Sequence, residues 1–115
     1  MKSASCKAKG RRLQDAVAGA IREAFGLPAS DVWPMLMGGN GMDIRLSEKA
    51  RAFWPYATEV KNQERINIWA AIKQAEEHAD KEKLSPLVVF SKNRERAYVV
   101  VSFEEFVAMQ KCVVR

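Results

Sequence analysis

The spacing of apolar residues along the chain predicts two long helices. Over residues 11–25 the apolar positions fall three or four residues apart, and Gly26 and Pro28 then end the helix. A second helix is predicted from Ile66 to about Ala79. Its apolar stripe consists of Ile68, Ile72, Ala75 and Ala79, with Trp69 beside it.

Four further segments read as strands. Residues 42–47 alternate between apolar and polar side chains, which places Asp43, Arg45 and Ser47 on one face. Residues 56–61 form the next strand, after a short irregular or helical connection closed by Pro55. Residues 86–92 and 96–102 follow, separated by a polar turn. The first of these two lacks alternation, so we expect it to be an interior strand buried on both faces.

A last helix is predicted over residues 102–109. It begins with a capping box from Ser102 to Glu105, and Val101 and Phe106 are placed as its hydrophobic staple. The resulting order, α-β-β-α-β-β-α, predicts a single α/β domain over residues 1–115. We expect a mixed central sheet of about four strands flanked by helices.

Composition narrows the class of protein. The 115 residues are 48% hydrophobic and 29% charged, a balance typical of soluble globular domains. The apolar runs are too short to span a bilayer, and no secretory signal is evident. The two cysteines, Cys6 and Cys112, and the single histidine, His78, lie far apart in sequence. This pattern fits neither a disulfide framework nor a zinc site, and it predicts a cytoplasmic location.

Positive charge is concentrated at the N-terminus. The net charge is +5, and residues 1–12 contain five basic residues and no acidic one, which leaves the rest of the chain neutral. We expect residues 1–10 to form a flexible basic arm. Such an arm suits a polyanionic partner such as a phosphate backbone. A solubilising tail would have the same composition, so charge alone does not decide between the two.

Three polar side chains on the two central strands suggest a catalytic site. Glu59 and Lys61, two residues apart, share one face of their strand. If that strand pairs with residues 42–47 and their core faces align, Asp43 lies beside both. Two adjacent carboxylates repel each other unless a cation bridges them, and Mg²⁺ or Mn²⁺ suits such hard oxygen ligands. The alternative is an ordinary solvated Glu–Lys pair.

This constellation resembles the PD-(D/E)xK nuclease superfamily. The segments that carry the resemblance are "KGRRLQ", "GNGMDI" and "FWPYATEVK", and the likeness extends from about Lys9 to Met109. It is closest to archaeal Holliday-junction resolvases and small phage-encoded nucleases. Met42 replaces the proline of the motif. The resemblance implies a restriction-endonuclease-like core and a metal-dependent endonuclease in which Asp43 and Glu59 bind Mg²⁺ or Mn²⁺ and Lys61 is the catalytic lysine.

The same resemblance implies further features. The substrate would be branched or duplex DNA, the protein a homodimer, and its location the cytoplasm of a bacterium or phage-infected cell. Many resolvases carry a glutamate on the first helix where this chain has Gln14, so Gln14 is either an auxiliary site residue or a border of the apolar stripe. Gln74 is a second auxiliary candidate, since many members place a polar residue on this helix near the scissile phosphate. A plain surface glutamine is its alternative.

The remaining candidate residues are assigned to possible roles from the chemistry of their side chains. The candidates for contacts with the DNA backbone are Lys9, Arg11, Arg12, Arg45 and Lys92. Trp33, Trp54 and Trp69 could stack on unpaired bases, but we assign them to the core. We expect no functional role for His78. The competing functions are a catalytically inactive DNA-binding accessory protein of the same fold and a structural or interaction protein.

Overall fold

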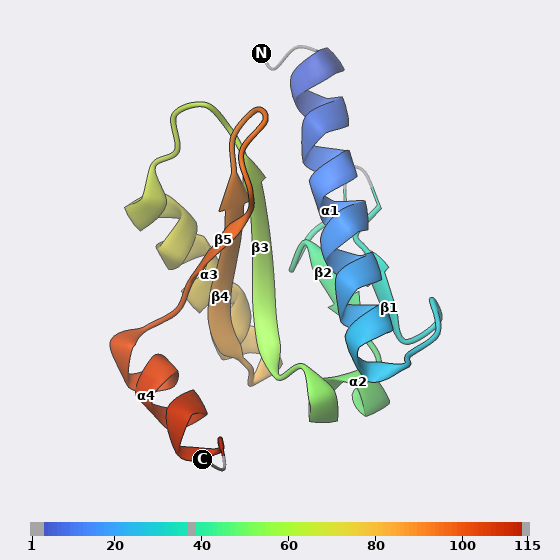
Figure 1. The fold of residues 1–115 in the computed structure, drawn as a ribbon, viewed down its shortest axis with the longest axis vertical. Helices are drawn as coiled ribbons and strands as arrows, with labels where there is room; N and C mark the ends of the chain where they lie inside the picture. Colours follow the sequence, from blue (N-terminus) through green and yellow to red (C-terminus); the bar gives the residue numbers. More distant parts are fainter. Residues whose placement is uncertain (1–3, 37–38, 114–115) are drawn as a thin grey trace.

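The computed structural model describes residues 4–36 and 39–113 (Figure 1). The elements in chain order are α1 (Ala4–Phe25), β1 (Val32–Pro34), β2 (Ile44–Leu46), α2 (Glu48–Phe53), β3 (Tyr56–Asn62), α3 (Ile68–Glu82), β4 (Ser85–Ser91), β5 (Tyr98–Val100) and α4 (Phe103–Lys111). No helix in these two ranges is both long enough and apolar enough to cross a membrane.

The strands form a mixed sheet of three strands and an antiparallel pair. In the larger sheet, β4 lies between β3, to which it is parallel, and β5, to which it is antiparallel. Helices α1 and α3 cover opposite faces (Figure 1): Val60 and Val89 belong to the core that α1 shares, whereas Val88 packs with alanines of α3. The α/β class is therefore confirmed, and β4 is the interior strand that its sequence predicted.

The two-stranded sheet was not predicted. Strand β2 pairs with β1, with Val32 opposite Leu46, so β2 and β3 do not form the ladder considered from the sequence. Strand β1 was missed because it is only three residues long and ends at Pro34, a residue that is uncommon within strands. The two sheets meet at Asp43, whose backbone N–H donates to the Thr58 carbonyl at 3.1 Å.

The first helix is longer than its apolar pattern predicted. Helix α1 begins at Ala4, so the expected flexible arm is wrong for residues 4–10, while residues 1–3 lie outside the described ranges. Lysine and alanine favour helix even without an apolar stripe. The Asn62 side chain donates to the Lys9 carbonyl at 3.3 Å and ties α1 to the end of β3. Gly26 ends the helix in the left-handed region, at φ 64°, as its sequence indicated.

Two of the three tryptophans are not in the core. Trp69 is 77% exposed and Trp33 is 37% exposed, so their core assignment is wrong. Trp54 is half-buried and donates to the Thr58 hydroxyl at 2.9 Å. Helix α3 packs on the sheet through small residues, Ala71, Ala75 and Ala79. Trp69 is two residues before Ala71, about 200° around the helix, and therefore faces outward.

Candidate active site

Asp43 is fixed at the edge of β3 by its backbone and its side chain. Its carboxylate oxygen Oδ2 accepts a hydrogen bond from the Val60 N–H at 2.7 Å, and its carbonyl accepts from the Met35 N–H at 2.8 Å. The turn that precedes Asp43 contains Gly39 and Gly41 and brings the chain to the edge of β3. Gly41 has φ 105°, a backbone conformation that residues with a side chain rarely adopt, so this turn requires glycine.

Glu59 lies in the middle of β3 and is 1% exposed. Its Oε1 is hydrogen-bonded to Nδ1 of His78 on α3. Burial raises the pKa of Glu59 to about 8, and the neighbouring Asp43 adds to the increase through charge repulsion and a side-chain hydrogen bond, while the positive charge of Lys61 opposes it. The three side chains singled out in the sequence are therefore close enough to interact.

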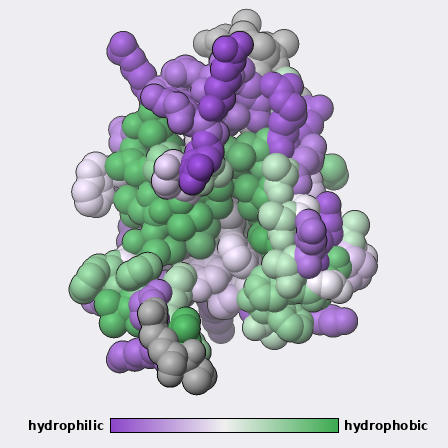
Figure 2. Space-filling model, in the orientation of Figure 1, coloured by the Kyte–Doolittle hydropathy of each residue, from purple (hydrophilic) through white to green (hydrophobic). Residues whose placement is uncertain are grey.

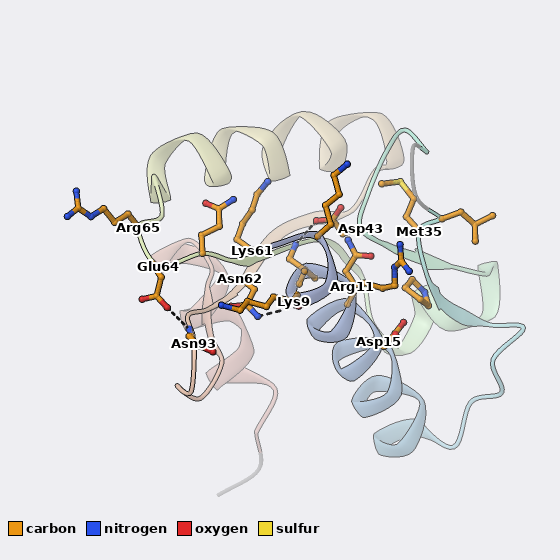
Figure 3. Close-up of a pocket in the computed structure, with 17 residues that line it drawn as sticks. Lys9, Arg11, Asp15, Met35, Asp43, Lys61, Asn62, Glu64, Arg65 and Asn93 are labelled. Atoms are coloured by element: carbon orange, nitrogen blue, oxygen red, sulfur yellow. Dashed lines mark hydrogen bonds between the residues drawn. The ribbon is translucent and has the colours of Figure 1, made fainter. Parts of the chain in front are cut away.

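Lys61 and Asp43 line a cleft of about 1070 Å³ at the end of β3 (Figure 3). Lys61 is half-buried. Glu59 is not among the lining side chains, and it approaches the cleft from the buried middle of the strand. Of the three side chains, Asp43 and Lys61 therefore line the cleft, and Glu59 lies within interaction range of both.

Helix α1 contributes a polar side to this cleft. Lys7, Lys9, Arg11 and Gln14 all line it (Figure 3 labels Lys9 and Arg11). Lys7, Arg11 and Gln14 are four and three residues apart and so share one helical face. Lys7 was missed because residues 1–10 were expected to be a flexible arm. Extending the helical period backward from Gln14 would have found it.

Other predicted residues lie elsewhere. Arg12 is exposed on α1, Lys92 is exposed after β4 and Gln74 is exposed on α3; none of the three lines the cleft. Arg45 donates to the Asn40 carbonyl at 3.2 Å and lines a second cavity of about 490 Å³, together with His78. Of the auxiliary and DNA-contact candidates, Gln14, Lys9 and Arg11 are thus the ones brought to the cleft.

His78 is a second residue that sequence reasoning missed. It was expected to have no role, yet it hydrogen-bonds the buried Glu59. The available signal was its position: His78 is three residues after Ala75 and seven after Ala71, on the border of the face that packs on the sheet. A polar residue there requires a buried partner.

The donor set fits a hard divalent cation. Asp43 and Glu59 supply carboxylate oxygens at one place, and a cation between them would relieve the repulsion that helps to raise the pKa of Glu59. Within residues 4–36 and 39–113, no three histidine, cysteine or acidic side chains gather in an arrangement that could hold a metal ion. A two-carboxylate site completed by water and phosphate oxygens matches Mg²⁺ or Mn²⁺ better than zinc.

Comparison with known proteins supports the class of protein that the sequence resemblance implied. The sequence model of the family described as "Phage putative PDDEXK endonuclease" matches residues 5–112, almost the whole chain, and the chain belongs to this family. The resemblance to the PD-(D/E)xK superfamily and to its phage-encoded members is thereby confirmed. Comparisons with curated proteins and with solved structures gave no significant match.

Proposed function

We propose that this protein is a divalent-metal-dependent endonuclease that hydrolyses phosphodiester bonds in DNA. The observation that carries the proposal is that Asp43 and Lys61 line one cleft and that the buried Glu59 interacts with both. Membership of a PDDEXK endonuclease family supports it. A binding protein gains nothing from two carboxylates where phosphate must approach, because they repel the ligand.

The residues have separate roles in this proposal. Asp43 and Glu59 hold Mg²⁺ or Mn²⁺, which would polarise the scissile phosphate and lower the pKa of an attacking water. Lys61 lines the same cleft as Asp43 and orients that water or offsets the charge that develops on the phosphate. Gln14 lines the same cleft and can hydrogen-bond water or phosphate.

The cleft is suited to a nucleic-acid backbone. Lys7, Lys9 and Arg11 border it on α1, and Arg65 borders it after β3. Positive charge on both sides of a catalytic acid draws phosphate in and offsets the repulsion of the acids. Branched DNA, such as a four-way junction, is the substrate suggested by the resolvase resemblance, and a homodimer is part of this proposal because two clefts could then reach two strands.

The test is cleavage of labelled linear duplex and four-way junction DNA with Mg²⁺, with Mn²⁺ and with chelator. We expect metal-dependent internal cuts that Lys61→Ala reduces by at least about a hundredfold. Lys73→Ala is the matched control, because Lys73 is an exposed lysine on α3 outside the cleft. Cleavage that persists in chelator or in Lys61→Ala would contradict the mechanism. If the wild-type protein binds DNA but cleaves it under none of these conditions, the inactive accessory protein is favoured instead.

A further inference from the structure

The C-terminal part of the described chain carries apolar side chains that nothing covers. Among the large apolar residues that are exposed in residues 4–36 and 39–113, six lie on β5, on α4 or next to α4. Tyr98 contacts the ring of Phe90 and points to the opposite face of the sheet from Val99. The other five are Val99, Phe103, Phe106, Val107 and Val113. Phe103 is 80% exposed. We call these five residues the C-terminal apolar patch. In Figure 2 apolar surface lies over the region of β5 and over part of α4, while hydrophilic side chains gather where α1 begins.

Helix α4 contacts the rest of the fold through polar side chains rather than through a buried apolar face. None of its residues is buried, and Figure 1 shows it standing apart from the sheets. Its N-terminus is capped by Ser102, and Glu105 accepts a long hydrogen bond, 3.5 Å, from the Ser85 hydroxyl. A nine-residue helix is marginally stable by itself in water, and most helices are stabilised by packing an apolar face. The apolar face of α4 therefore needs a cover.

Strand β5 adds a second unpartnered feature. It is the last strand in the order β3-β4-β5, so one of its edges is free of strand pairing within the described residues. Tyr98 and Val99 on this edge strand are each 57% exposed. An exposed apolar edge strand next to an exposed apolar helix is a surface that promotes association with another chain.

We propose that the C-terminal apolar patch is the interface of a symmetric homodimer, with β5 and α4 packed against the same elements of a second copy. This rests on the homodimer of the proposed function and names its surface. The exposed parts of Phe103 and Phe106 alone present roughly 260 Å², about a third of the ~800 Å² that each partner buries in a standard interface. The three valines extend it.

Charge favours a second copy over DNA as the occupant. Residues 94–113 contain three basic and three acidic residues, so two copies of this surface do not repel each other in spite of the chain's net charge of +5. Lys7, Lys9 and Arg11 of α1 line the cleft instead. In a two-fold dimer the same patch serves both subunits, and the two clefts remain open to DNA.

Sedimentation of the 115-residue chain tests this interface. We expect a mass of twice the 13.0 kDa of one chain. Phe103→Glu and Val99→Lys should each weaken self-association by at least about tenfold, since each places a charge in an apolar interface. Both side chains are exposed, so the monomer should keep its fold, which circular dichroism verifies. Trp69→Glu is the matched control, because Trp69 is equally exposed but lies on α3.

The outcomes separate this inference from the nuclease proposal. A wild-type monomer at high protein concentration, or a mass that keeps growing with concentration, overturns the interface. A dimer that Trp69→Glu disrupts and Phe103→Glu does not overturns it as well, while leaving a homodimer in place. If a monomeric protein shows metal-dependent cleavage, the homodimer proposal fails and the proposed catalytic chemistry stands. The two results are independent because the mass measurement requires no activity.

Discussion

His78 on α3 is hydrogen-bonded through Nδ1 to Oε1 of Glu59 in the middle of β3, where the carboxyl group is 1% exposed. One oxygen of Glu59 is thereby engaged by the helix that covers this face of the sheet. The other oxygen is left for Asp43 or a cation. Partners of this kind orient metal ligands, and their loss typically costs ten- to a hundredfold in metal affinity.

Replacement of His78 should therefore weaken metal binding and the fold together. His78→Ala leaves a buried carboxyl without its partner, and we expect a loss of about 1–3 kcal/mol in the free energy of unfolding and at least about a tenfold loss of Mn²⁺ affinity. Urea unfolding and calorimetric titration measure the two effects. His78→Asn should restore part of both, because its amide nitrogen occupies nearly the position of Nδ1. Equal defects in the two variants would argue against the hydrogen bond.

The raised pKa of Glu59 predicts how stability depends on pH. Between its ordinary value of 4.5 and about 8, folded Glu59 keeps a proton that the unfolded chain releases. Without a divalent cation, stability should therefore fall as pH rises through this window, by on the order of a few kcal/mol. Urea unfolding from pH 5 to 8.5 measures it. Glu59→Gln, which imitates the protonated form, should flatten the curve, and identical slopes in the two proteins would disprove the shift.

The same pKa makes metal binding dependent on pH. A metal ligand must lose its proton, so Mn²⁺ affinity should rise with pH up to about 8 and then level off. Binding should also release a proton near pH 7, which calorimetry in buffers of different ionisation enthalpy detects. An affinity that is constant from pH 6 to 8 would show that Glu59 is already ionised before the metal binds.

Asp43→Asn should separate the charge of Asp43 from its structural role. The asparagine oxygen can still accept the hydrogen bond from the Val60 N–H, so the fold should persist. Removal of the negative charge should lower the pKa of Glu59, although burial keeps it above 4.5. Carbon-13 NMR of the glutamate carboxyl groups follows this titration. Asp15→Asn, another acid that lines the cleft, is the control and should leave Glu59 unchanged.

DNA affinity should depend on which cations of α1 line the cleft. Lys7→Ala removes a cleft cation, so it should lower the affinity and reduce the salt slope, d log K/d log [salt], by about 1. Arg12→Ala removes an exposed cation of the same helix outside the cleft and should do less. Fluorescence anisotropy in Ca²⁺ at several salt concentrations compares them. Equal losses would mean that the charge of the helix, rather than the cleft, binds DNA.

The sequence alone determined much of the fold, because the periodicity of apolar and polar residues is a local property. The two-residue repeat of a strand placed Glu59 and Lys61 on one side, and the missing alternation of residues 86–92 identified the interior strand. Ser102 was identified as a cap from its spacing to Glu105, and the hydroxyl of Ser102 accepts from that residue's N–H at 3.0 Å. Each of these features depends on residues within a few positions of one another.

Tertiary structure decided what depends on distant contacts. Asp43 precedes a strand of the separate two-stranded sheet, and it lies near Glu59 because its carboxylate accepts a hydrogen bond from the Val60 N–H. His78 contacts Glu59 because α3 packs closely on the sheet through its alanines. In the sequence, the apolar residues of β5 and α4 resemble core residues. In the folded chain, the residues of the C-terminal apolar patch are exposed. The physical reason is that side-chain type and spacing fix which face a residue occupies, whereas the packing of elements fixes what that face meets.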